Sequence, residues 1–113
     1  MAIVASGRLD QRITLQKKTI ARGALGGHIE TWSTLAVVYA ETLDMSGREI
    51  FNAKAMGSEA TMKITIRWRG DVEPDQRVVF SDGSMARIEW IRHVTRKQYL
   101  ELYCLYLDQG SYE

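Results

Sequence analysis

One run in the middle of the chain constrains the fold most, because its apolar and polar side chains alternate without a break. Between Met62 and Arg69 the apolar positions are Met62, Ile64, Ile66 and Trp68, and the positions between them are Lys63, Thr65, Arg67 and Arg69. A period of two is typical of a β-strand with one face in a core and the other in solvent. We therefore expect a strand here, with Ile64, Ile66 and Trp68 largely buried and its cations outside.

Five further runs have the character of strands. They extend from Gln11 to Lys18, Thr31 to Leu43, Gln76 to Phe80, Met85 to Val94, and Tyr99 to Leu107. Asp82-Gly83 lies between two of them and favours a tight hairpin turn. The last run should place one set of side chains on a common buried face, namely Leu100, Leu102, Cys104 and Tyr106.

A single helix is predicted after the second strand. Ser46 and Glu49 match the capping box, in which the serine side chain accepts from the N3 amide and the glutamate reaches back. Ile50, Ala53 and Met56 recur at helical spacing, and Gly57 stands where a helix-ending glycine belongs. Six strands and one short helix with long loops predict a mainly β fold, a small six-stranded antiparallel barrel or sandwich.

Two connections are longer than ordinary turns. The first, from Thr19 to Ile29, contains Arg22, Gly23, Gly26, Gly27 and His28, and its glycines predict a flexible loop. The second, from Asp44 to Ala60, carries the predicted helix start at Ser46, Gly47 and Arg48. We expect these two segments to be the most mobile parts of a free domain.

Length and composition indicate one compact domain. The 113 residues carry 15 Lys and Arg against 14 Asp and Glu, so the net charge of +1 gives no general attraction to nucleic acid or membrane. We expect residues 1–113 to form one domain with an ordered core over about 7–107. No apolar run has the length of a membrane span, and no signal peptide is recognisable, so we expect a protein of the reducing cytosol.

The chemistry-bearing residues do not form a catalytic pattern. Cys104 lies on the apolar face of the last strand, where a thiol usually behaves as a small buried hydrophobe. His28 and His93 have no nucleophile motif beside them, and the carboxylates lack metal-ligand spacing. We therefore expect no enzyme, no metal and no cofactor.

A basic stripe gives the only local charge signal. Lys63, Arg67 and Arg69 share the polar face of the central strand, with same-face neighbours about 6.6–6.8 Å apart. That spacing is close to twice the nucleotide rise of a DNA strand, about 7 Å, so the stripe is a candidate DNA-facing surface. The alternative is a solvated face whose cations keep the strand soluble. Trp68 should point to the opposite face and so take no part in base stacking.

The ordered set of motifs resembles the phage head–tail joining proteins, also called head-closure, stopper or head–tail adaptor proteins. The segments that carry the resemblance are Gly7–Gln16, Gly26-Gly27 before Trp32, Ala40-Glu41, Ser46–Glu49, Thr65–Arg69, Pro74–Val78 and Leu100–Cys104. They are collinear over nearly the whole chain, although each motif alone is weak.

The resemblance implies a β-barrel with a small helix whose copies form a ring below the portal of a phage or prophage particle. Such a ring helps retain packaged double-stranded DNA, contacts portal and tail proteins, and belongs to the virion after assembly in the bacterial host cytoplasm. A monomer is expected for the isolated protein. A loop that projects into the channel contributes to closure: the resemblance favours the second long connection, whereas flexibility favours the first. A monomeric nucleic-acid-binding barrel is the alternative reading of the basic stripe.

Overall fold

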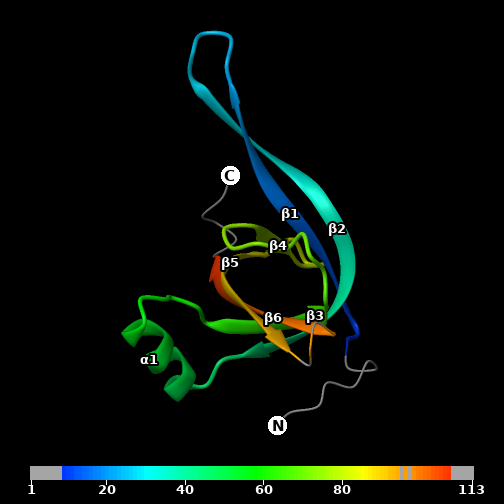
Figure 1. The fold of residues 1–113 in the computed structure, drawn as a ribbon, viewed down its shortest axis with the longest axis vertical. Coiled ribbons are helices and arrows are strands. Elements are labelled where there is room, and N and C mark those ends of the chain that lie inside the picture. The colour runs from blue at the N-terminus through cyan, green and yellow to red at the C-terminus, as the bar shows by residue number, and fades with distance from the viewer. Residues whose placement is uncertain (1–8, 95, 97, 108–113) are drawn as a thin grey trace.

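Six antiparallel strands close into a barrel, with one helix outside it (Figure 1). The computed structural model describes residues 9–94, 96 and 98–107. Its elements are β1 (Gln11–Arg22), β2 (His28–Asp44), α1 (Gly47–Ala55), β3 (Met62–Arg67), β4 (Arg77–Val79), β5 (Met85–Val94) and β6 (Tyr99–Leu107). The strands follow the order β1-β2-β3-β6-β5-β4 around the barrel. The expected mainly β fold is confirmed, and it is a closed barrel rather than a sandwich.

The core fills the barrel with the inward side chains that alternation predicts. Ile64 and Ile66 of β3 pair with Leu102 and Leu100 of β6, and all four are at most 1% exposed. The remaining fully buried members are Ile13, Leu15, Val78, Ala86, Ile88, Ala40 and Cys104. Burial raises the pKa of the Cys104 thiol, so this residue is a core side chain and not a nucleophile at neutral pH.

A β-bulge changes the phase of β5. Ile88 pairs with Cys104 and Trp90 with Tyr103, which leaves Glu89 as an extra residue between them. Because the bulge adds one residue, Ile88 and Ile91 both contact the core, three positions apart rather than two. The bulge therefore turns Trp90 outward against Tyr103.

Three expectations for single side chains are wrong. Trp68 is only partly buried, because β3 ends at Arg67 and strict alternation ends with it. Tyr106 is 47% exposed, since it lies at the open end of the barrel and lines a hollow of about 640 Å³ there. Thr65, expected outside, is buried at 3% exposure between Glu41 and Glu101 of the neighbouring strands.

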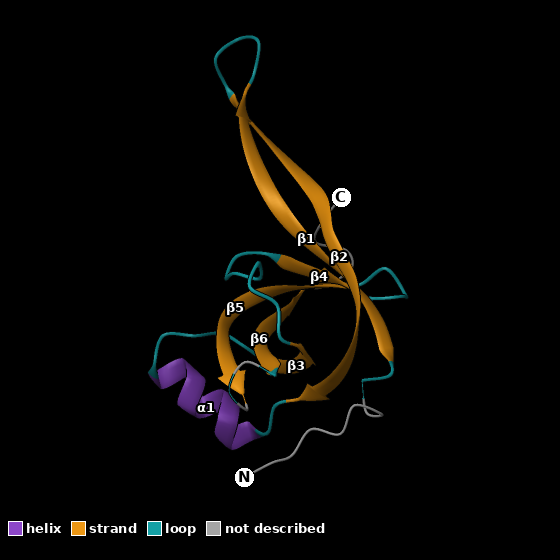
Figure 2. Cartoon of the chain, turned by 45° about the vertical axis from the view of Figure 1, so that its right-hand side comes forward, coloured by secondary structure: helices purple, strands orange, loops and turns teal. Residues whose placement is uncertain are grey.

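The first long connection is not a loop. β1 and β2 continue as a paired ribbon from Lys17 with Ser33 to Arg22 with His28, leaving only residues 23–27 as a turn. β4 pairs with β1 no further than Gln16, and β3 pairs with β2 only from Ala40 onward. Residues 17–34, here called the arm, therefore leave the barrel as a two-stranded projection (Figures 1 and 2).

The second connection is ordered around α1. Ser46 is the N-cap, both halves of the capping box are present, and Met56 is the C-cap. Gly57 has a φ of +85°, and the amides of Gly57 and Ser58 donate to the carbonyls of Lys54 and Ala53. This is the Schellman arrangement, which needs a left-handed residue after the C-cap. The predicted helix is confirmed in its start and its end.

Candidate functional site

The described residues contain no metal-binding cluster. No group of three or more His, Cys, Asp and Glu side chains within this part of the chain lies close enough to hold an ion. Among the described helices, none has the length and apolar character needed to cross a membrane. The features that remain to be explained are surfaces: the arm, the face beside α1, and the basic stripe.

The arm is fixed to the barrel by an aromatic side chain at its base. The guanidinium of Arg77 lies 4.1 Å from the centre of the Trp32 ring, and the Lys18 ammonium lies 6.0 Å from it. The Arg77 Nε also donates to Gln16 at 2.6 Å, which ties β4 to the strand that leaves the barrel. Cation–π contacts of this kind stabilise by about 0.5–2 kcal/mol each, so the arm has a fixed direction at its root.

Beyond that base the arm buries almost nothing. Ile20 and Ile29 are 57% and 53% exposed, and Leu25 in the turn is fully exposed. The turn itself is compact: Gly26 has a φ of +90°, and its amide donates to the carbonyl of Gly23 at 3.0 Å. The predicted channel-loop residues Arg22, Gly23, Gly26, Gly27 and His28 all lie at this end of the arm. A ribbon with exposed large aliphatic side chains is typical of a surface that binds a partner.

The second candidate segment lies against the barrel instead of projecting. α1 packs at the outside of the barrel beside β6, where Met45, Ala53, Ala60 and Tyr103 form a small second core. Ser46, Gly47 and Arg48 are exposed at the start of the helix. Two apolar residues of the segment, Phe51 and Met56, point away from this core and are 72% and 85% exposed.

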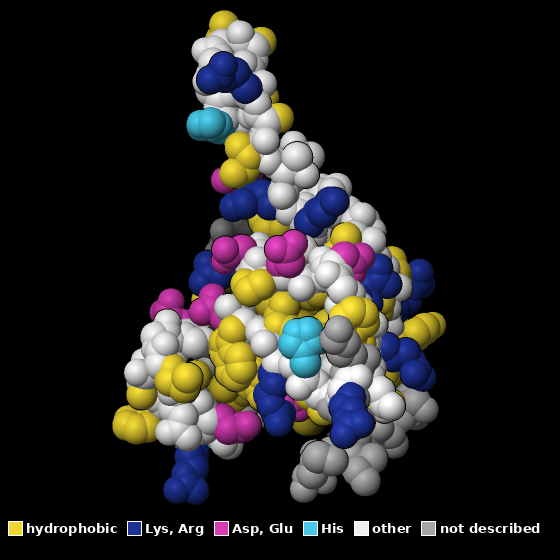
Figure 3. All heavy atoms as spheres, in the orientation of Figure 1, with side chains coloured by type: hydrophobic (Ala, Val, Ile, Leu, Met, Phe, Trp, Pro, Cys, Tyr) yellow, Lys and Arg dark blue, Asp and Glu magenta, His cyan; other side chains and the backbone are white. Residues whose placement is uncertain are grey.

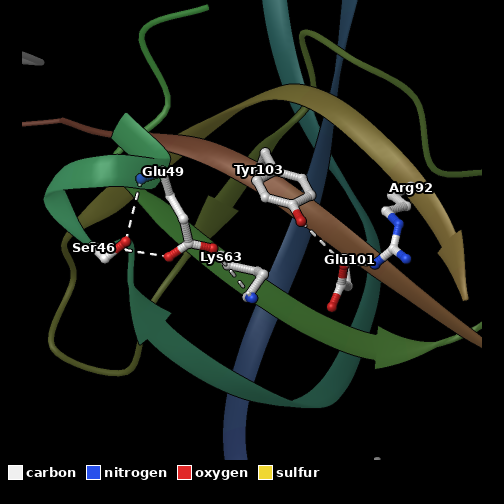
Figure 4. Close-up of polar contacts among 6 residues, drawn as sticks. All are labelled: Ser46, Glu49, Lys63, Arg92, Glu101 and Tyr103. Atoms are coloured by element: carbon white, nitrogen blue, oxygen red, sulfur yellow. Dashed lines mark hydrogen bonds and ion pairs between the residues drawn. The ribbon is translucent and has the colours of Figure 1, made fainter. Parts of the chain in front are cut away.

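A polar network joins α1 to β3 (Figure 4). The Glu49 amide donates to the Ser46 Oγ at 3.2 Å, and the Ser46 amide donates to the Glu49 carboxylate at 2.9 Å. Lys63 of β3 lies 3.8 Å from the same carboxylate. The Ser46 amide, with help from Lys63, holds the pKa of Glu49 below its ordinary value.

A second polar network joins β5 to β6 (Figure 4). The Glu101 carboxylate accepts from Arg92 at 2.7 Å and from the Tyr103 hydroxyl at 3.1 Å. The Tyr103 ring stacks on Trp90 with their centres 3.8 Å apart. Burial, together with the Glu101 charge, raises the pKa of Tyr103 to about 12.

The basic stripe is not a row of three free cations. Lys63 pairs with Glu49, and Arg69 makes two hydrogen bonds to the Asp71 carboxylate at 3.0 and 2.9 Å. Those bonds lower the pKa of Asp71. Arg67 is exposed and lines a hollow of about 370 Å³ with Tyr39, Trp68 and Arg69. Trp68 thus lies beside two of the cations, whereas alternation predicts it on the opposite face.

Sequence reasoning missed the exposed apolar residues of both surfaces. Leu25 and Trp90 belong to no motif, and Met56 stands out in the sequence only for the helical spacing that it shares with Ile50 and Ala53. One sequence signal of an exposed apolar residue was present at Phe51. It follows Ile50 directly on a short helix, and adjacent helical residues do not face the same side, so the helix cannot bury both.

Comparisons with known proteins agree with one another. The family model of the phage head completion protein matches residues 4–106. The head completion protein gp7 of Enterobacteria phage HK97 is 29% identical over 77 residues, covering 68% of this chain and 69% of its own length.

Two solved structures have the same fold. The solution structure of protein SF1141 from Shigella flexneri 2a is 26% identical, with a TM-score of 0.78 over 97% of this chain and 100% of its own. A chain from the virion of a native gene transfer agent particle is similar in fold, with a TM-score of 0.59 at 17% identity over 87% of this chain and 94% of that one. A family model that spans nearly the whole chain, with these relatives, shows that this protein belongs to the phage head completion protein family.

Proposed function

We propose that this protein is a ring-forming subunit of the head–tail connector, where it helps retain packaged double-stranded DNA and provides a docking surface for the tail. As a member of the head completion family it is a structural component of the phage head and a virion protein. Portal or head connector proteins and tail proteins are then its partners. The ring, the DNA retention and the docking are the parts that this proposal adds.

The observation that carries the proposal is the arm. Each strand of the closed barrel is paired with a neighbour on both sides over part of its length, which leaves little free sheet edge through which subunits could join. The arm has the longest free edges, because over residues 17–34 its two strands pair only with each other. It makes the molecule 53 Å long while the other two dimensions are 29 and 27 Å.

We assign the projecting role to the arm and not to the segment around α1. That second segment, residues 44–60, has a capped helix and a buried contact with Tyr103, so it would have to unpack before it could project. The arm needs no such rearrangement. Its backbone stays paired out to the turn, which supports a role in contacts at a distance from the barrel, either in the channel or between subunits.

Shortening the arm tests the proposal. Residues 19–31 are replaced by Asn-Gly, so that Lys18 and Trp32, which already pair, flank the tight turn that joins two strands. The barrel should stay folded, because these residues bury little and loop length changes closure entropy slowly. Particles assembled with the shortened protein should lose packaged DNA or fail to join tails. Normal DNA retention and tail joining, with the variant present in the particle, would contradict the assigned role.

The monomeric nucleic-acid-binding alternative is tested on the isolated protein. Salt-dependent binding of duplex DNA that falls on Arg67→Ala would favour it, because Arg67 is the exposed member of the stripe outside the pairs with Glu49 and Asp71. Lys63→Ala is the matched comparison, since it removes a cation that is already paired. DNA binding that is absent, or equal in both variants, would leave the connector role as the better account.

A further inference from the structure

Two apolar surfaces at opposite ends of the described molecule have no partner within it (Figures 1 and 3). One is the arm tip, residues 20–29, where Ile20, Leu25 and Ile29 are all more than half exposed. The other is a groove beside the C-terminal end of α1, here called the α1 groove. Its volume is about 400 Å³, and it is lined by Ala53, Met56, Gly57, Ser58, Glu89 and Trp90.

The α1 groove has a rigid floor. Ala53 is buried in the second core, and the Schellman turn at Gly57 fixes the chain that follows the helix. Trp90 is held by stacking on Tyr103, so one face of its indole is covered while 37% of the residue stays exposed. Met56 stands at the edge at 85% exposure and can adapt to an incoming side chain. A fixed aromatic floor with an adaptable edge suits an aliphatic side chain.

The arm tip carries an exposed aliphatic side chain and a charge that complement the groove. Leu25 is its most exposed side chain, and an isolated two-stranded ribbon is at best marginally stable in water without a surface to pack on. Lys18 is paired with Glu30 across the ribbon, which leaves Arg22 as an exposed cation near the tip. Beside the groove, Glu59 is exposed, and its amide donates to the Glu89 carboxylate at 3.3 Å. Arg22 and Glu59 are therefore complementary charges beside complementary apolar surfaces.

We infer that the arm tip of one copy docks in the α1 groove of a second copy, with Leu25 against Met56 and Trp90 and with Arg22 near Glu59. A subunit cannot fill its own groove, because the two surfaces lie at opposite ends of one chain (Figure 1). The complementary charges of Arg22 and Glu59 make a second copy the occupant that fits. Such a contact joins two different surfaces of the same protein. When it repeats from subunit to subunit, the chain of subunits closes into a ring if the rotation between neighbours adds up to a full turn. The inference rests on the proposed ring and assigns the contact that holds it together.

Pairing of engineered cysteines tests the contact. Because the isolated protein is expected to be a monomer, particles are assembled from a mixture of protein carrying Leu25→Cys and protein carrying Met56→Cys. They are oxidised mildly, and the mixed disulfide dimer is measured. The native Cys104 does not interfere because it is buried. The control replaces Met56→Cys by Arg48→Cys on the same helix. Position 48 lies about 12 Å along the axis from position 56, beyond the reach of a disulfide to the same partner.

The expected result is a mixed 25–56 dimer that forms about tenfold faster than the 25–48 dimer, since only the docked geometry holds two thiols together. Equal rates for the two pairs would overturn the inference. Charge reversal gives a second readout. Arg22→Glu and Glu59→Arg should each slow 25–56 pairing by about tenfold, and the double variant should restore it. If the double variant forms the 25–56 disulfide more slowly than either single variant, the placement of Arg22 near Glu59 is overturned.

Particles separate failure of this contact from failure of the proposed function. Particles assembled without the protein should leak DNA or lack tails if the function is right. When that defect is present but 25–56 pairing is absent, the connector function stands and the arm docks on another virion protein, which overturns the inference. When particles lacking the protein retain DNA and join tails, the proposed function fails whatever the cysteine result.

Discussion

The same two strands are buried in the barrel and exposed in the arm. On β1, Ile13 and Leu15 are 1% and 0% exposed, while Ile20, only five residues beyond Leu15, is 57% exposed. The residue types are alike, and the backbone pairing with β2 continues through both regions. The difference lies in what the side chains meet: the closed barrel supplies five other strands, whereas the arm has only its own partner strand. Pairing between β1 and β2 is therefore enough to form the strands, whereas the burial of a side chain depends on whether it lies in the barrel or in the arm.

The two regions should therefore respond differently to substitution. A barrel residue contributes to the free energy of unfolding through its buried surface, about 25 cal/mol per Å². An arm residue buries little in the free protein, so its contribution should appear only when a partner covers it. The predictions below compare the two regions, with the largest expected effect first.

Truncation in the barrel core should have the largest effect. Leu102 is fully buried and pairs with Ile64, so Leu102→Ala removes packed methyl groups and leaves a cavity. We expect the free energy of unfolding to fall by about 2–5 kcal/mol, measured by urea denaturation. A decrease in the free energy of unfolding of less than about 2 kcal/mol would mean that neighbouring side chains fill the cavity, which a closed core should prevent.

The outer network of the barrel should come next. Tyr103→Phe removes the hydroxyl that donates to the Glu101 carboxylate, and we expect a loss of about 1.5–3 kcal/mol at neutral pH. Because folding raises the pKa of Tyr103 from 10.0 to about 12, its contribution is complete below pH 10 and is lost as the pH rises through 12. The difference between the wild type and Tyr103→Phe should therefore narrow across that window in pH-dependent unfolding measurements. A constant difference would contradict the assigned titration.

The helix cap should have an intermediate to small effect. Ser46→Ala removes the acceptor for the Glu49 amide, so the free energy of unfolding should fall by about 0.5–2 kcal/mol. Folding lowers the pKa of Glu49, so its contribution is present above its ordinary value of 4.5 and is lost as the pH falls through the folded value. Thermal unfolding at several pH values should show the difference between the wild type and Glu49→Gln shrinking in acid. An unchanged difference would mean that the bond from the Ser46 amide does not depend on the carboxylate charge.

Substitution on the arm should have the smallest effect on the free protein. Ile20→Thr keeps a β-branched side chain on an exposed strand and should change the free energy of unfolding by no more than about 0.5 kcal/mol. Its effect should instead appear in particle assembly, where the arm meets its partner. A large loss of stability in the isolated protein would show that the arm packs on the barrel more than its exposure indicates.

Periodicity alone was enough for the parts of the chain that have a core to face. The bounds of β5 and β6 and α1 with its capping box were predictable from residue spacing, and so was the burial of Ile64 and Ile66 on β3 and of Leu100, Leu102 and Cys104 on β6. These features are local, because a strand with one buried face must alternate and a helix end must satisfy its free amides. The resemblance to head–tail joining proteins also followed from the linear order of motifs, and the family match agrees with it.

The arm, the bulge at Glu89 and the surroundings of the basic stripe were decided only by the tertiary structure. Residues 19–22 have no core to face, so no alternation marks them as a strand, and only their pairing with residues 28–31 makes them one. Glu89 is displaced because β5 must meet β6 in register on both sides of it. Lys63 pairs with Glu49, which lies 14 residues away on a different element, and Arg69 pairs with Asp71, two residues away. Side-chain spacing reports what one segment buries, whereas these features depend on which segments the closed barrel brings together.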